Sequence, residues 1–371
     1  MSVTKGLEGI VAAASSISSI IDGVLTYRGY NIDVLAENAS FEEVIHLLWY
    51  GKLPNAGELA KLKAQLSEHA PVPEPVIQIL RSAPPDAHPM AVLRTAVSAL
   101  ALHDPDADDM SEAANLRKAI KLQAKLPTIV AAYGRIREGK EPVAPLRDVS
   151  LAHNFLYMLS GSRPEQVAET ALDKALVLHA DHELNASTFA SRVTVATLSD
   201  IYSGVTSAIG ALKGPLHGGA NEGVMAMLEE IGSEDNAEPY IRAKLEARER
   251  IMGFGHRVYK NGDPRAKHLQ KMSLELGKMT GNMTWYNISV KVEELMNRLK
   301  GLKPNVDFYS ASVYTSLGIP RYLFTPIFAV SRVSGWTAHI IEQYADNRLI
   351  RPRAEYVGPT DQKFVPIAER A

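Results

Sequence analysis

A predominantly helical fold is what the sequence predicts. Segments with the apolar spacing of helices follow one another from residue 40 to about residue 180, and proline or glycine bounds most of them. Alternating strand–helix–strand units, which would indicate a doubly wound parallel sheet, do not occur. The chain has 371 residues, of which 46% are hydrophobic and 22% charged, so it can fill two domains or one large one.

Short extended elements are expected at the start of the chain. Residues 7–35 are rich in apolar and β-branched side chains and are interrupted by Asp22-Gly23, which suggests one or two small strands or extended turns. Residues 40–43, SFEE, form a capping box, and residues 44–50 continue with helical spacing. Further helices are expected over 57–69, 75–82, 89–103, 111–125, 128–138, 150–160 and 164–180.

The second half of the chain is also expected to be mainly helical. Residues 187–209 are small and β-branched, which suits a tightly packed core helix or a subunit interface. Helices are expected over residues 218–230, over most of 266–300 and over 324–344. The basic tail 348–353 is interrupted by proline, so it is expected to be an arm rather than a helix.

Composition excludes several classes of function. The chain has no cysteine, which rules out disulfides, thiolate metal sites, iron–sulfur clusters and cysteine nucleophiles. A net charge of −2 gives no support for a role with nucleic acid or at a membrane surface. Residues 1–14 lack the apolar run of a signal peptide, and no window reaches the roughly 18 apolar residues of a membrane span, so a cytoplasmic protein is expected.

Residues 253–265, GFGHRVYKNGDPR, combine a glycine turn, a histidine and an arginine. The glycines of GFG lack a Cβ, so the backbone can approach a ligand closely. Asp263-Pro264 is a helix-start signal with Asp at the N-cap, which would place Arg265 in a first helical turn that favours an anion. The segment therefore predicts a proton donor, His256, followed by an anion clamp. A glycine loop with an incidental histidine is the alternative.

Two other stretches contain histidines in unusual settings. In residues 178–183, LHADHE, His179 and His182 are three apart and would share a helix face. Such a pair can bind zinc, but no third ligand is adjacent, and structural histidines are the simpler interpretation. Four glycines surround His217 in residues 211–223, so its ring is either exposed or pressed against a ligand. A helix that begins just after it would favour the neutral ring, which can donate to a developing oxyanion.

Asp307 and Arg332 complete the set of candidate residues. Asp307 precedes an apolar run, where a role as N-cap would explain it. Arg332 lies on an otherwise apolar helix, and a buried arginine demands an anion. An aspartate base and a neutral histidine donor are the pair needed to remove a proton next to a carbonyl and hold the enolate. Several arginines beside histidines suggest a small di- or tricarboxylate substrate.

The sequence resembles citrate synthase over nearly its whole length. Residues 253–265 match the signature segment of this family without a mismatch. Its other motifs have counterparts in the right order at residues 178–183, 213–221, 305–310 and Arg351-Pro352. The resemblance is to the shorter bacterial type, without a long N-terminal extension.

The resemblance implies an all-α fold of two domains. Residues 1–217 and 313–371 would form the large helical domain, and residues 218–312 the small domain that closes over the active site. The reaction would be that of an acyltransferase of the tricarboxylic acid cycle. It would condense acetyl-CoA with oxaloacetate and then hydrolyse citryl-CoA to citrate and CoA.

The resemblance also implies a role for each candidate residue. Asp307 would abstract a methyl proton from acetyl-CoA, and His217 would stabilise the resulting enolate. His256 would polarise and protonate the oxaloacetate carbonyl. The carboxylates of oxaloacetate would be bound by His182, Arg265, Arg332 and Arg351.

Arg351 would come from the partner subunit, which makes a homodimer the active form. Coenzyme A would lie against Gly253, Phe254, Gly255 and Lys260. CoA is thus expected as part of a co-substrate, with no permanently bound cofactor, no metal, no nucleic acid and no membrane partner.

Two alternatives stay open at the level of sequence. A 2-methylcitrate synthase would use propionyl-CoA with the same residues, and one methylene discriminates by only about 1–3 kcal/mol. The remote alternative is a non-catalytic helical protein that binds a metal through His179 and His182. In the enzyme interpretation His179 is structural and orients its neighbours.

Overall fold

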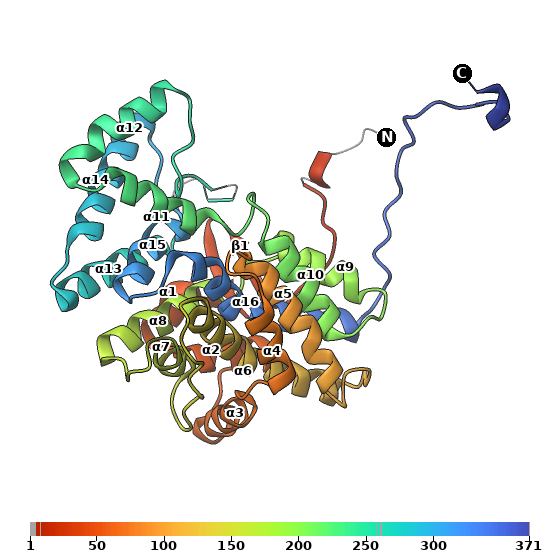
Figure 1. The fold of residues 1–371 in the computed structure, drawn as a ribbon, viewed down its shortest axis with the longest axis horizontal. Coiled ribbons are helices and arrows are strands. Elements are labelled where there is room, and N and C mark those ends of the chain that lie inside the picture. The colour runs from red at the N-terminus through yellow and green to blue at the C-terminus, as the bar shows by residue number, and fades with distance from the viewer. Residues whose placement is uncertain (1–4, 8, 257, 260–261, 371) are drawn as a thin grey trace.

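The computed structural model describes residues 5–7, 9–256, 258–259 and 262–370. Helices make up most of this part of the chain, and the only sheet within it is small (Figure 1). The prediction of an all-α fold is confirmed. Short 3₁₀ turns accompany the longer helices at Lys5–Leu7, Ala101–His103, Glu234–Asn236, Arg321–Leu323 and Ile367–Glu369.

The sheet is an antiparallel meander close to the N-terminus. Its strands pair in the order β1 (Ser18–Ile21), β2 (Val24–Tyr27), β3 (Tyr30–Asn31). This agrees with the extended elements expected within residues 7–35. The helix α1 (Ile32–Asn38) that follows was not expected, and it starts where the Asn31 side chain accepts a hydrogen bond from the Asp33 N–H.

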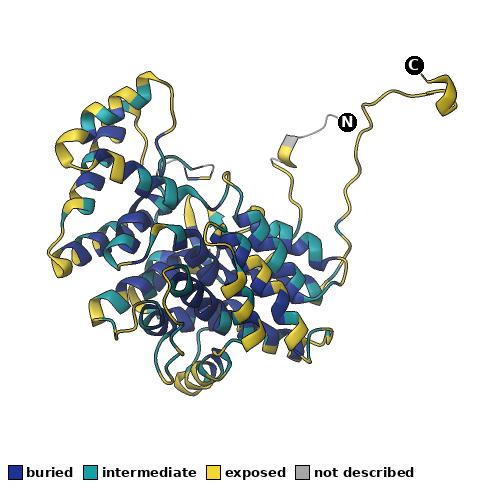
Figure 2. Ribbon diagram, in the orientation of Figure 1, coloured by how far each residue is buried: buried dark blue, intermediate teal, exposed yellow. Residues whose placement is uncertain are grey.

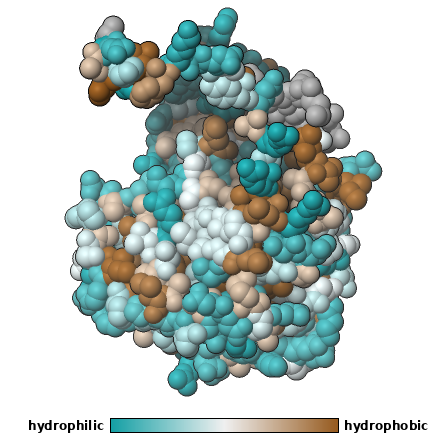
Figure 3. Space-filling model, turned by 90° about the vertical axis from the view of Figure 1, so that its right-hand side faces the viewer, coloured by the Kyte–Doolittle hydropathy of each residue, from teal (hydrophilic) through white to brown (hydrophobic). Residues whose placement is uncertain are grey.

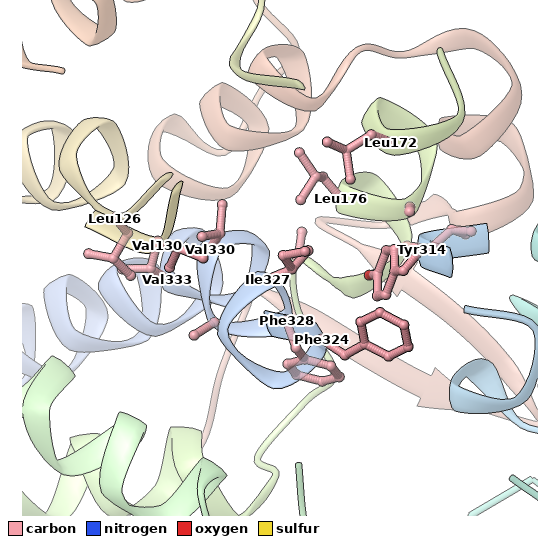
Figure 4. Packing of buried hydrophobic residues seen from close by; sticks show 14 of the residues in the cluster. Leu126, Val130, Leu172, Leu176, Tyr314, Phe324, Ile327, Phe328, Val330 and Val333 are labelled. Atoms are coloured by element: carbon pink, nitrogen blue, oxygen red, sulfur yellow. The ribbon is translucent and has the colours of Figure 1, made fainter. Parts of the chain in front are cut away.

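A large helical body surrounds the central helix α16 (Phe324–Ala345), most of whose residues are buried. The other helices of this body are α2 (Phe41–Tyr50), α3 (Ala56–His69), α4 (Glu74–Ser82), α5 (Pro89–Leu100), α6 (Glu112–Arg137), α7 (Leu151–Ser160), α8 (Gln166–His179), α9 (Ala186–Val195) and α10 (Ile201–Leu212). Figure 4 shows Leu126 and Val130 of α6 beside Val330 and Val333 of α16. Burial of this apolar surface is the main stabilising term of the body.

Two helix boundaries in the body differ from the sequence prediction. Pro127 was expected to separate two helices, but α6 runs through it without a break. A proline inside a helix removes one backbone hydrogen bond, yet residues 126–134 are all buried, so tertiary packing sustains the helix. Residues 187–209 form α9 and α10 rather than one element, because the Asp200 side chain caps a new helix. These two helices pack closely, since a Cβ at Gly204 would lie 2.6 Å from Val195.

A second group of helices forms the left-hand side of Figure 1. It consists of α11 (Ala220–Ile231), α12 (Ala237–Glu246), α13 (Ala266–Thr280), α14 (Thr284–Lys300) and α15 (Val306–Ser316). Helices α13 and α15 pack on each other, and α13 also packs on α8 of the large body. Figure 2 shows that the outer faces of this group are exposed while the faces toward the body are buried.

The C-terminal segment leaves the body as an extended arm (Figures 1 and 2). Residues 348–353 are not helical, as the sequence predicted. The arm exposes large apolar side chains at Tyr356, Val357 and Phe364. On the side of the molecule from which the arm leaves, the body shows hydrophobic residues interspersed among hydrophilic ones (Figure 3). In the part of the chain that is described, every helix is too short or too polar to cross a bilayer.

Candidate active site

A cavity of about 430 Å³ brings together most of the residues that the sequence singled out. The predicted residues that line it are His182, His217, His256, Arg265, Asp307 and Arg332. They come from segments spread over 150 residues of sequence, so only the fold makes them neighbours. Another cavity, of about 630 Å³, lies between residues 12–16 and residues 348–350, and it contains none of these side chains.

The first histidine pair does not share a helix face, so that prediction is wrong. Helix α8 ends at His179, and His182 lies in the loop beyond it. His179 is fully buried, its Nδ1 lies 2.7 Å from the Ala175 carbonyl oxygen, and burial lowers its pKa to about 3. Among the described residues no group of three or more His, Cys, Asp or Glu side chains is arranged to hold a metal.

The ring of His182 lies beside two other rings, those of His256 and Tyr259. Its Nε2 is 2.9 Å from the Tyr259 hydroxyl, and its ring centroid is 5.3 Å from that of His256. Burial, with the charges of Arg265 and Arg332, holds the pKa of His182 well below its ordinary value. The ring is therefore neutral near neutral pH. Tyr259 was missed by the sequence reasoning, although it lies inside the signature segment.

His217 is held by a serine that nothing in the sequence marked. Its Nε2 is 2.8 Å from the Ser187 hydroxyl and accepts from the Ser187 backbone N–H at 3.3 Å. A backbone N–H only donates, so the neutral ring carries its proton on Nδ1. Burial and, less strongly, Arg332 lower the pKa of His217 to about 4. Helix α11 begins at Ala220, two residues later than predicted, so His217 still precedes a helix start.

His256 follows a turn that requires glycine. Gly253 has a φ of 81°, and a Cβ there would lie 2.8 Å from side-chain atoms of Phe308 and Val224. The Nδ1 of His256 accepts from the backbone N–H of residue 258 at 3.0 Å and of residue 259 at 3.3 Å, which leaves the proton on Nε2. Burial and the nearby Arg265 lower the pKa of His256. A neutral Nε2–H is thus available as a hydrogen-bond donor.

Arg265 is buried in a bidentate ion pair with Asp263. The Nε–Oδ1 distance is 2.9 Å and the Nη2–Oδ2 distance is 2.7 Å. Asp263 was expected to be an N-cap, but α13 begins at Ala266, and Arg265 occupies the cap position. The Asp263 carboxylate still accepts from the Arg265 backbone N–H at 3.1 Å, as a cap would, and it also binds the guanidinium and accepts from the Val306 N–H at 3.0 Å.

Arg332 is buried without a carboxylate partner among the described residues. Its Nε donates to the His179 carbonyl oxygen at 2.7 Å, and its guanidinium carbon lies 4.6 Å from the centre of the Phe328 ring. Burial lowers the pKa of Arg332 to about 10, although Asp181 opposes this shift. A buried guanidinium without a carboxylate partner favours the binding of an anion.

Asp307 lies in the first turn of α15, but it is not the cap that the sequence suggested. The N-cap is Asn305, whose side chain accepts from the Asp307 N–H at 3.0 Å. Burial raises the pKa of the Asp307 carboxyl to about 6, while the charge of Arg265 acts in the opposite direction. A carboxylate with a raised pKa is a stronger base than one in water.

The remaining predicted residues lie elsewhere. Arg351 is exposed on the C-terminal arm and does not line the cavity of its own chain. Lys260 lies outside the described residues. Gly255 lines an adjoining cavity of about 260 Å³ together with Lys303, and Phe254 packs on Phe308 with ring centroids 4.6 Å apart.

Known proteins resemble this chain over its full length. The sequence model of a family described as "Citrate synthase, C-terminal domain" matches residues 6–353. "Citrate synthase 2" of Bacillus subtilis is 65% identical, with 100% of both chains covered. "2-Methylcitrate synthase 1" of Corynebacterium glutamicum is 44% identical, with 99% of this chain and 98% of the relative covered.

A solved structure is also similar to this chain over its full length. It is described as the ternary complex of carboxymethyl coenzyme A and oxaloacetate with citrate synthase from Thermoplasma acidophilum. That protein is 37% identical to this chain, the TM-score is 0.93, and 100% of both chains is covered.

Proposed function

The chain belongs to the citrate synthase family, and we propose that its 430 Å³ cavity is where acetyl-CoA condenses with oxaloacetate. It is an enzyme of the citrate synthase type, an acyltransferase that forms citryl-CoA and hydrolyses it to citrate and CoA. One observation supports this site most strongly. A carboxyl group with a raised pKa, neutral histidines and two buried arginines line the same cavity.

The first step is proton transfer from the methyl group of acetyl-CoA to Asp307. The pKa of about 6 leaves this carboxyl ionised near neutral pH and more basic than an exposed aspartate. His217 donates its Nδ1–H to the thioester oxygen as negative charge develops there. Its neutral state favours such a donor, because a charged imidazolium would have to be buried in the same site.

The second step joins the enolate carbon to the carbonyl carbon of oxaloacetate. Arg332, Arg265 and His182 bind the oxaloacetate carboxylates, and the His256 Nε2–H donates to the carbonyl oxygen and passes its proton to it as the bond forms. Asp307 then releases the proton it took, and His256 regains one from solvent, which resets both groups. Water then cleaves the thioester of citryl-CoA and releases CoA. Three residues of the signature segment, Gly253, Phe254 and Gly255, lie along the proposed path of CoA, and Lys260 is the residue proposed to bind its phosphates.

The active form is a homodimer in which Arg351 of the partner subunit completes the oxaloacetate site. Support comes from the arm, which carries Arg351 and exposed apolar side chains away from the cavity of its own chain. Residues 1–217 and 313–371 act as the large domain, and residues 218–312 close over oxaloacetate as the small domain. The cytoplasm and the tricarboxylic acid cycle are the proposed setting, in keeping with the family.

The reaction is tested by CoA release in the presence of both substrates. Acetyl-CoA with oxaloacetate should give a steady release of free thiol, and omission of oxaloacetate should abolish it. No release of thiol with either acetyl-CoA or propionyl-CoA would overturn the proposal that condensation takes place in this cavity.

A second acyl substrate is favoured by one specific observation. Relatives named 2-methylcitrate synthase match the chain almost as completely as those named citrate synthase. The kcat/KM values for acetyl-CoA and propionyl-CoA should therefore be compared at saturating oxaloacetate. A higher value for acetyl-CoA is expected, and a clear preference for propionyl-CoA would assign the chain to 2-methylcitrate synthesis.

A further inference from the structure

A serine hydroxyl from the N-terminal sheet bonds to both sides of the loop that carries His182. Ser18 on β1 donates its hydroxyl hydrogen to Oδ2 of Asp181 and accepts from the backbone N–H of Glu183 at 2.8 Å. One hydroxyl thus joins the residue before His182 to the residue after it. Glu183 has a φ of 53°, an unfavourable conformation for a residue with a side chain, so this loop needs outside support.

A second hydroxyl from the same sheet contacts the same loop. Tyr27 on β2 is the direct cross-strand partner of Ser18. Its hydroxyl accepts from the Asp181 N–H at 3.2 Å and lies 3.0 Å from the Asp181 carbonyl oxygen. The cross-strand pair of Ser18 and Tyr27 therefore holds both the side chain and the backbone of Asp181.

His339 on α16 bonds to the same carboxylate oxygen of Asp181 as Ser18 does, Oδ2, while Oδ1 has no hydrogen-bond partner among the described residues. Arg192 of α9 donates from Nη1 to Nδ1 of His339 at 3.1 Å. Because a guanidinium has no acceptor, Nδ1 is the acceptor, and the His339 proton is on Nε2, which donates to Asp181 at 3.2 Å. Arg192 is paired in turn with Glu342 at 2.7 Å.

The electrostatics of the loop depend on the same carboxylate. Asp181 is completely buried, and burial alone would raise its pKa, but His339, Arg332 and the Ser18 hydrogen bond together lower it. The carboxylate is therefore ionised, and its charge offsets that of Arg332 inside the protein. A fixed buried charge of this kind holds its neighbours in one arrangement.

We propose that Ser18, Asp181 and His339 are positioning residues for oxaloacetate binding, acting through the orientation of His182. The inference rests on the proposed function, in which His182 binds oxaloacetate. His182 lies past the end of α8, so the helix itself does not fix its ring. The contacts from β1, β2 and α16 hold the loop before the substrate arrives, and a ligand group that is already oriented binds with a smaller loss of entropy.

The test measures oxaloacetate dissociation constants by calorimetry on the purified full chain. Ser18→Ala removes both hydrogen bonds of this hydroxyl and should weaken oxaloacetate binding about two- to tenfold, while the KM for acetyl-CoA at saturating oxaloacetate stays unchanged. Ser19→Ala is the matched control, because Ser19 lies next on the same strand and bonds to Thr26 instead. Ser18→Thr keeps a hydroxyl and should bind oxaloacetate more tightly than Ser18→Ala.

A second pair of variants tests the same inference from α16. His339→Gln keeps one donor and one acceptor and should bind oxaloacetate nearly as the wild type does, whereas His339→Leu removes both and should not. An equal loss of oxaloacetate binding in both variants would contradict the role of the His339 ring as a hydrogen-bond bridge between Arg192 and Asp181. Melting temperatures measured alongside show whether any variant is merely unfolded.

The double variant Ser18→Ala with His182→Gln distinguishes a failure of this inference from a failure of the proposed function. If Ser18 acts through His182, then Ser18→Ala should have no further effect on oxaloacetate affinity in the His182→Gln background. Additive losses would overturn the positioning role. Normal affinity in His182→Gln alone would instead overturn the proposed role of His182. Wild-type protein without CoA release would overturn the proposed reaction itself.

Discussion

Ser187 contacts Nε2 of His217 with both its backbone and its side chain. The N–H donates at 3.3 Å, and the hydroxyl lies 2.8 Å away. The same hydroxyl accepts from Trp336 Nε1 at 3.1 Å and lies 2.8 Å from the acceptor Oδ1 of Asn185. The backbone contact fixes the tautomer of His217, and the side-chain contact fixes the tilt of its ring. The proposed enolate donor, His217, is therefore oriented by α9, and not by the glycine-rich segment in which it occurs.

Ser187→Ala should lower kcat moderately, by about two- to tenfold, because the hydroxyl is lost while the backbone N–H still selects the Nδ1–H tautomer. Oxaloacetate affinity should not change. Ser191→Ala, on the same helix and equally buried, removes a hydroxyl that bonds only to the Thr188 carbonyl oxygen, and it should keep full activity. An equal fall in kcat for both variants would mean that α9 is simply perturbed.

The rate of the chemical step should fall below about pH 6. Asp307 accepts a proton only as the carboxylate, and burial raises its pKa to about 6, so each unit of pH below that value should reduce kcat about tenfold. Protonation of His217, whose pKa is lowered to about 4, should affect the rate only at more acidic pH. Steady-state kcat between pH 5 and pH 9 checks this, and a flat profile down to pH 5 would contradict the assignment of Asp307 as the base.

The ionisation of Asp307, which activity requires, should lower the stability of the folded protein. The pKa of Asp307 is higher in the folded state than in the unfolded chain, so the folded protein binds the proton more tightly. The ionised carboxyl therefore lowers stability above pH 6, and the effect disappears below about pH 4. Asp307→Asn should raise the free energy of unfolding at pH 7.5 by up to about 3 kcal/mol while turnover is lost.

Urea denaturation at pH 7.5 and at pH 4 measures this difference. Asp108→Asn, at an exposed position, serves as the control and should change stability little at either pH. A stabilisation by Asp307→Asn that is the same at both values of pH would arise from packing rather than from ionisation.

The sequence predicted the residues that line the cavity more fully than the residues that support them. His217, His256 and Asp307 stand in segments with unusual glycine or helix-start patterns, so they could be found without a structure. Ser18, Ser187 and Tyr259 could not, because a hydroxyl residue in a strand or helix looks ordinary until its neighbours are known. These supporting contacts join residues 30 to 165 positions apart.

Errors in the fold prediction have the same physical origin. Pro127 stays inside α6 because the surrounding core compensates for a lost backbone hydrogen bond, which a local pattern does not show. At Asp263 the local pattern was incomplete rather than overruled, because the carboxylate accepts from the Arg265 backbone N–H and also binds the Arg265 guanidinium. Only at Pro127 did the core that the fold supplies override local propensity.

Arg351 provides the clearest test of subunit cooperation. Arg351→Ala should weaken oxaloacetate binding, although Arg351 does not line the cavity of its own chain.

The Asp307→Asn variant should bind oxaloacetate but not turn over. If Arg351 serves the partner subunit, a mixed dimer of these two variants has one intact site, built from the Asp307 of one chain and the Arg351 of the other. Co-refolded variants in equal amounts should then recover about 25% of wild-type activity, since half the dimers are mixed and each has one working site. Each variant refolded alone should stay inactive at low oxaloacetate. If the mixture also stays inactive, Arg351 acts within its own chain, and the arm must fold back onto the cavity from which it leads away.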